Sequence, residues 1–166
     1  MTENIKNWVE ISSVMIGVSL TVLTLMIGFR YPLDSIFLRA SAWALLVAVI
    51  LFTNAVTTNA KTMYELSRGS PQNIIDRWVK FAEFSFGLGF TMVLSAFAFV
   101  TYQIVDIIAP TILLGSAWLI MMFYTYLDAA LPDLQYKWLR SLKRNVWFLI
   151  ELVVLLIIYI DWLNLF

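Results

Sequence analysis

Residues 101–114 of the chain read TYQIVDIIAPTILL, and this stretch decides how many helices the chain has. It joins two apolar segments, 81–105 and 109–127, which only Asp106 and Pro110 interrupt. One continuous helix over both segments would be about 70 Å long at 1.5 Å per residue, more than twice the thickness of a bilayer. The sequence therefore predicts a tight turn from Asp106 to Pro110 between two membrane-spanning helices.

The composition of the chain agrees with a membrane location. Of its 166 residues, 61% are hydrophobic and only 13% are charged, which is more apolar surface than a soluble domain of this size can bury in one core. Three further apolar stretches are long enough to cross a membrane, at 8–29, 36–58 and 146–162. We predict an all-α integral membrane bundle of five transmembrane helices that forms a single domain over 1–166.

The basic residues are distributed unequally among the connections between these helices. Nine of the 11 Lys and Arg residues lie before the first span or in the second and fourth connections, and only Arg30 and Arg39 lie on the other side. Cytoplasmic loops of membrane proteins carry the excess of Lys and Arg. We therefore expect the N-terminus in the cytoplasm, the C-terminus outside, and a plasma or inner membrane as the location.

The second and third helices are expected to extend beyond the membrane. No helix-breaking residue occurs after Ile36 until Gly69, and Pro71 suits the start of the next helix. Segment 59–80 is therefore predicted to form a protruding cytoplasmic helical hairpin. Pairs of opposite charge one turn apart fit a solvated helix surface. These pairs are Lys61 with Glu65 and Asp76 with Lys80.

Segment 132–145, before the last span, has a two-sided helical pattern. Leucines and Trp138 fill one arc of a helical wheel, and basic residues fill the opposite arc. The pattern predicts a short interfacial amphipathic helix that contacts anionic lipid at the inner leaflet. A cytoplasmic turn is the alternative, and it accounts for the charges but not for the arcs. The basic residues are Lys137, Arg140, Lys143 and Arg144.

One face of the second span changes from polar to apolar near its middle. The polar part contains Asn54, Thr57 and Thr58, and the apolar part contains Leu46, Val47 and Ile50. In a functional interpretation, this face predicts a cytoplasm-facing polar vestibule of an ion pathway, closed by a hydrophobic constriction. In the alternative, structural interpretation, the helix has only left the hydrocarbon by Thr57, and Asn54 is bonded to a neighbouring helix.

Two acidic residues inside predicted spans are further candidates for the ion pathway. Glu151 lies about 8 Å into the last span. An ionisable group at that depth is costly unless it is paired, hydrated or protonated, which makes it a candidate functional residue. A static bond to Asn54 or to a hydroxyl of the fourth span is the alternative. Glu83 enters the third span one turn after Lys80, which can pair with it at the membrane interface.

The residue types that are missing narrow the function further. The chain has no Cys and no His, and its net charge is zero. We therefore expect no catalytic residues, no metal site, no cofactor and no nucleic-acid partner. Five spans do not divide into two equal inverted repeats, as secondary transporters require. We predict a small homo-oligomeric channel or ion-conducting protein. A non-catalytic structural or assembly subunit of a larger membrane complex is the alternative.

Overall fold

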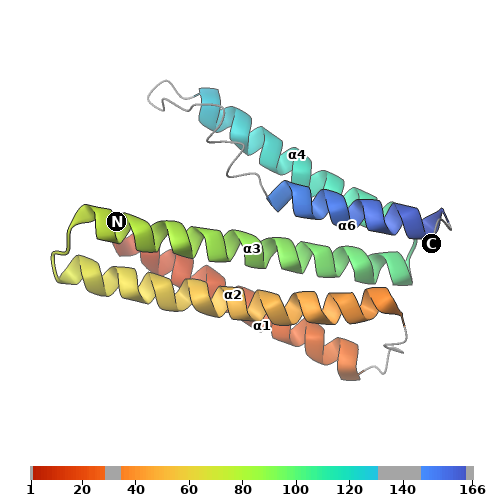
Figure 1. Cartoon of the computed structure of the whole chain (residues 1–166), viewed down its shortest axis with the longest axis horizontal. Coiled ribbons are helices and arrows are strands. Elements are labelled where there is room, and N and C mark those ends of the chain that lie inside the picture. Colours follow the sequence, from red (N-terminus) through yellow and green to blue (C-terminus); the bar gives the residue numbers. More distant parts are fainter. Residues whose placement is uncertain (1, 29–34, 131–146, 164–166) are drawn as a thin grey trace. The chain divides into compact units, whose positions relative to one another are not determined.

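A computed structural model of the whole chain describes residues 2–28, 35–130 and 147–163. This part of the chain forms five α-helices and no strand (Figure 1). The helices are α1 (Thr2–Gly28), α2 (Ile36–Ser67), α3 (Gln72–Ile104), α4 (Ile108–Ala130) and α6 (Trp147–Trp162). Within the described residues, α1, α2 and α3 are long and apolar enough to cross a membrane, and α4 contains a shorter apolar stretch. The predicted all-α architecture is confirmed for the described residues, and these three helices have the length and composition that a membrane span needs.

The break between α3 and α4 falls where the sequence predicts a turn. The Asp106 Oδ1 atom accepts a hydrogen bond of 2.6 Å from the Ile107 N–H, and the Asp106 carbonyl accepts one of 3.2 Å from Ala109. These bonds satisfy N–H groups that the start of a helix leaves without partners. We expected Pro110 to belong to the turn, and this was wrong. Pro110 lies in the first turn of α4, where its missing N–H costs nothing.

The connection between α2 and α3 is closed by a glycine in the left-handed conformation. Gly69 has a φ angle of 69°, which residues with a Cβ atom rarely adopt. Its N–H donates to the Leu66 carbonyl, and the Ser70 N–H donates to the Glu65 carbonyl, each at 3.1 Å. This pair of bonds defines a Schellman motif and satisfies two of the last carbonyls of α2. The predicted helix end at Gly69 is confirmed.

The chain divides into two compact units. Unit 1 (Met1–Val93) contains α1, α2 and the first part of α3. Unit 2 (Leu94–Phe166) contains the end of α3, together with α4 and α6. Each unit has buried residues of its own and is described by itself below.

The core of unit 1 follows one side of α2. Buried residues on this helix recur at alternating steps of three and four, a spacing typical of helices that pack at shallow angles. Most of them are small, which lets neighbouring helices approach closely. The residues with this spacing are Leu38, Ser41, Leu45, Ala48, Phe52, Ala55, Asn59 and Thr62, and Phe37 and Thr58 next to them are buried as well.

Aromatic rings join the three helices of unit 1. The Phe86 ring of α3 lies edge-on to the Trp8 ring of α1, at 5.0 Å between centroids, and to the Phe52 ring of α2, at 5.5 Å. One turn beyond Ser85, a Cβ atom added at Gly89 would lie only 3.0 Å from the Phe52 ring. The packing of α2 against α3 therefore depends on the missing side chain at Gly89.

Candidate functional site

The polar residue at the centre of the predicted vestibule takes part in helix packing. The Asn54 Nδ2 atom on α2 donates a hydrogen bond of 2.9 Å to the Ser85 Oγ atom on α3. Asn54 is half-buried, and Ser85 is buried one turn before Gly89. A polar group in an apolar bundle must find a partner inside the protein. Asn54 has such a partner, as the structural interpretation of this residue expects.

The two threonines of the predicted vestibule point in different directions. Thr58 is buried in unit 1, whereas Thr57 is exposed on the surface of α2. The Thr57 hydroxyl donates to the Asn54 carbonyl at 3.0 Å, so its polar atom is satisfied within its own helix. The three vestibule residues therefore do not share one open face, and only Thr57 lies on it.

The predicted hydrophobic constriction lies on the outer side of α2. Leu46, Val47 and Ile50 are exposed by 39%, 40% and 67%, respectively. They extend the outer face that carries Thr57, away from the packed residues of the helix. A constriction built from this face needs a second surface opposite it, and it stays a prediction.

Glu83 lies on a different side of α3 from the polar bond to α2. At 100° per residue it is about 160° around the helix from Ser85, and its side chain is exposed. The structure therefore does not bring Glu83 together with Asn54 in unit 1. The part of Glu83 in an ion pathway stays a prediction.

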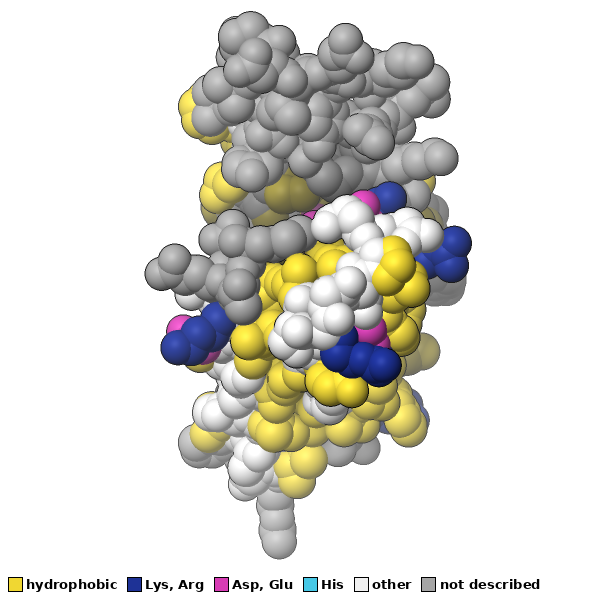
Figure 2. Space-filling view, turned by 90° about the vertical axis from the view of Figure 1, so that its left-hand side faces the viewer, with side chains coloured by type: hydrophobic (Ala, Val, Ile, Leu, Met, Phe, Trp, Pro, Cys, Tyr) yellow, Lys and Arg dark blue, Asp and Glu magenta, His cyan; other side chains and the backbone are white. Residues whose placement is uncertain are grey.

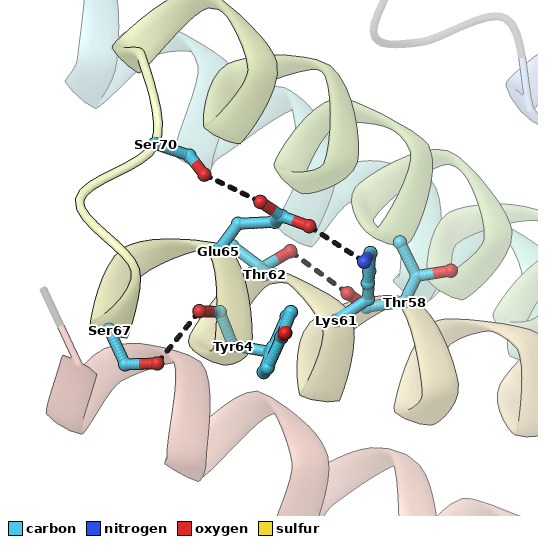
Figure 3. A network of polar contacts seen from close by, with 7 residues as sticks. All are labelled: Thr58, Lys61, Thr62, Tyr64, Glu65, Ser67 and Ser70. Atoms are coloured by element: carbon cyan, nitrogen blue, oxygen red, sulfur yellow. Dashed lines mark hydrogen bonds and ion pairs between the residues drawn. The ribbon is translucent and has the colours of Figure 1, made fainter.

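A polar network does form where α2 meets α3 (Figure 3). The Lys61 Nζ atom lies 2.6 Å from the Glu65 Oε1 atom, and the Ser70 Oγ atom donates to Glu65 Oε2 at 2.6 Å. The Tyr64 ring lies below two cations, with Lys61 Nζ at 4.9 Å and Arg68 at 5.7 Å from its centroid. The predicted pairing of Lys61 with Glu65 is confirmed, and Glu65 also fixes the start of the turn.

The second predicted pair on this hairpin is not the contact that forms. The Asp76 Oδ1 atom accepts a hydrogen bond of 2.8 Å from the Gln72 Nε2 atom, one turn earlier on α3. Gln72 lies four residues before Asp76 and Lys80 lies four residues after it, so both are within reach on the helix surface. Among the described residues, Lys61 with Glu65 is the ion pair found.

Unit 2 contains a buried carboxyl group, and among the side chains that the structure describes it is the one acidic group found buried. Glu151 on α6 is 6% exposed, and its Oε2 atom accepts a hydrogen bond of 2.8 Å from the indole Nε1 atom of Trp118 on α4. The Trp118 ring also stacks on Phe148, with centroids 5.1 Å apart. The fourth helix supplies a partner for Glu151, as the structural alternative expects, and this partner is the indole of Trp118. The sequence signal for Trp118 was its position in mid-span, since Trp is enriched at membrane interfaces.

A second polar layer of unit 2 lies towards the other end of α6. The Tyr102 hydroxyl donates to the Asp161 Oδ2 atom at 2.7 Å, and the Thr111 and Tyr159 hydroxyls lie 3.1 Å apart. Glu151 and Asp161 are ten positions apart, or about 15 Å along the helix. Buried apolar side chains fill the space between the layers, and they are Leu114, Val154 and Ile158.

The predicted amphipathic helix lies outside the described residues. This applies to all of 132–145, including Lys137, Arg140, Lys143 and Arg144. Its contact with anionic lipid stays a prediction.

The two units thus differ in the polar residues that they bury. In unit 1 the half-buried amide of Asn54 bonds to the buried hydroxyl of Ser85, and unit 2 buries the carboxyl of Glu151. Asn54 and Glu151 belong to different units, and each has a hydrogen-bond partner within its own unit. No protein-family model, no curated protein and no solved structure matches the chain.

Proposed function

We propose that the chain is a five-span membrane protein that conducts ions as a homo-oligomer. In this proposal α4 and α6 add two spans to those of α1, α2 and α3. The excess of Lys and Arg on one side supports a cytoplasmic N-terminus and an external C-terminus in a plasma or inner membrane. The ion-binding group is the carboxyl of Glu151.

The observation that carries this proposal is the burial of Glu151 between α4 and α6. Ionising a carboxyl in an apolar environment costs several kcal/mol unless a cation or proton accompanies the charge. A buried carboxyl therefore binds and releases a proton or a cation more selectively than an exposed one does. The Trp118 indole can donate to an oxygen of either the protonated or the ionised carboxyl, so it holds the group in place through both states.

The oligomer supplies the surface that one chain leaves open on α2. Leu46, Val47 and Ile50 continue into Thr57 along one exposed face. When copies of this face surround a common axis, the apolar part forms the hydrophobic constriction and Thr57 faces the cytoplasmic vestibule. Asn54 borders this face and joins it to α3 through its bond to Ser85, and Thr58 is buried next to Thr57.

The role of Glu151 is tested by ion flux into liposomes that contain the purified chain. We expect wild-type protein to conduct protons or monovalent cations and the Glu151→Gln variant to lose this flux, because the amide cannot ionise. Glu83→Gln is the matched control, since it removes an exposed carboxyl from α3 and is expected to conduct as wild type does. A wild-type chain that conducts no ion, or a Glu151→Gln variant with unchanged flux, contradicts the proposal.

The oligomer is tested separately by native mass spectrometry from lipid nanodiscs. We expect a single closed oligomer, and we expect Ile50→Lys to break it, because the charge would be placed on the proposed contact face. A chain that is monomeric under all these conditions excludes a pathway formed by α2.

The exposed face of α2 also favours a second candidate function. In a non-catalytic structural or assembly subunit, the same face binds another protein of a membrane complex. Trp43, which is 69% exposed at the apolar end of this face, is a large side chain suited to such a contact. Photocrosslinking from position 43 in native membranes distinguishes the two candidates. Crosslinks to a different protein favour the subunit, and crosslinks only between copies of this chain favour the channel.

A further inference from the structure

The first turns of α3 carry a shallow cavity that the proposed function does not use. Its volume is about 440 Å³, and it is lined by Ile74, Arg77, Trp78 and Phe81. These residues follow one another at steps of three, one and three, so they share one side of the helix. Ile74 and Phe81 are both exposed, which leaves the cavity accessible. Figure 2 shows the end of the molecule with the α2–α3 connection, where basic side chains lie on a largely apolar surface.

Arg77 is the one charged residue among those that line the cavity. The acidic residues nearby, Asp76 and Glu83, lie about 150° and 170° around α3 from the centre of the lining. Asp76 is also engaged by Gln72. Among the described residues, the guanidinium of Arg77 has no hydrogen-bond or ion-pair partner, whereas Lys61 is paired with Glu65. The cavity therefore combines apolar walls with one available positive charge.

The position of the cavity along α3 corresponds to the membrane boundary. The apolar part of α3 begins at Phe81, and Arg77 and Trp78 lie one turn before it. Arg and Trp side chains are typical of this level, where head groups meet acyl chains. Further into the membrane, Phe84 continues the exposed apolar surface of the helix.

We propose that this cavity binds one anionic phospholipid. The phosphate accepts hydrogen bonds from the Arg77 guanidinium, whose fork of N–H groups matches two phosphate oxygens. One acyl chain lies against Phe81 and Phe84, and Ile74 closes the outer edge of the cavity. A zwitterionic lipid fits less well, because its head-group cation finds no acidic residue in the lining. The site is independent of Glu151 and of ion conduction.

The site is tested by native mass spectrometry of the full chain with phosphatidylglycerol and phosphatidylcholine of identical acyl chains. We expect wild-type protein to retain phosphatidylglycerol in preference. Arg77→Gln should lower this preference about fivefold, the effect of one basic residue near an anionic lipid surface. Lys80→Gln is the matched control, because it removes the same charge one turn further along α3 from a residue that does not line the cavity, and its preference should equal that of wild type.

Two further measurements separate the alternatives. Arg77→Lys keeps the charge and should keep most of the preference, which distinguishes lost charge from misfolding. Inorganic phosphate in excess should leave the lipid bound, because the acyl chain contributes to binding. Equal losses in Arg77→Gln and Lys80→Gln, no preference in wild type, or displacement by phosphate would each overturn the proposal.

Discussion

Units 1 and 2 each join apolar helices by a side-chain hydrogen bond, but they use groups of different chemistry. In unit 1 the bond of 2.9 Å links the neutral Asn54 and Ser85, next to the contact of Phe52 with Gly89. In unit 2 the bond of 2.8 Å ends on a carboxyl, that of Glu151. The Asn54–Ser85 pair stays uncharged over the ordinary pH range, whereas a carboxyl group can release and bind a proton. Polarity in a membrane helix therefore indicates function mainly where the polar group can change its charge.

The largest effect on stability is expected at the close contact in unit 1. Gly89→Leu forces a side chain into the space of the Phe52 ring, which lies 3.0 Å from the position of a Cβ atom. Overpacking of this kind should lower the free energy of unfolding by about 3 kcal/mol. Unfolding of the purified protein by a denaturing detergent measures the change.

The control for this substitution is Gly17→Leu in α1. A Cβ atom at Gly17 meets no atom within 4 Å, so the added side chain should cost little. Equal destabilisation by both substitutions would mean that leucine is unfavourable in these helices generally. The close contact of Phe52 with Gly89 would then not be a special feature of the packing in unit 1.

A smaller effect is expected from the loss of the acceptor in unit 2. Glu151→Leu leaves the Trp118 indole N–H without its acceptor in a buried site, which should cost about 2 kcal/mol. Glu151→Gln keeps an acceptor oxygen and should unfold at nearly the wild-type detergent concentration. If Glu151→Gln is as unstable as Glu151→Leu, charge matters to the fold of unit 2, and the loss of ion flux in that variant reports folding and not conduction.

The smallest effect is expected from the neutral bond in unit 1. A double-mutant cycle with Asn54→Leu and Ser85→Ala should give a coupling free energy of about 0.6 kcal/mol, as for other polar pairs within membranes. The four proteins of the cycle are compared by the same detergent unfolding. A coupling above about 2 kcal/mol would place this bond outside the range of ordinary polar contacts within membranes. It would contradict our interpretation of Asn54 as an ordinary packing residue.

The ends of the helices could be predicted from the sequence because they depend on neighbouring residues. Gly69 ends α2 through its own left-handed backbone, and Asp106 starts α4 through a bond to the next residue. Neither needs information about distant parts of the chain. Pro110 was misplaced by a few residues because proline suits both a turn and the first turn of a helix.

The side-chain partners could not be predicted in the same way. Asn54 and Ser85 are 31 positions apart, and Trp118 and Glu151 are 33 positions apart. Periodicity placed Asn54 and Thr57 on one arc, but packing against α3 takes up Asn54 and leaves Thr57 exposed. The choice depends on where the neighbouring helix lies, which one helical wheel does not contain. The exposed position of Glu83 has the same cause.

The contact of Phe52 with Gly89 also limits how this chain can evolve. The ring and the missing side chain share one volume, so a larger residue at position 89 is tolerable only after the residue at position 52 becomes smaller. The two positions lie on different helices and are expected to change together, in opposite directions of size. In a set of diverged chains with this fold, that covariation would identify the pairing of α2 with α3 from sequence alone.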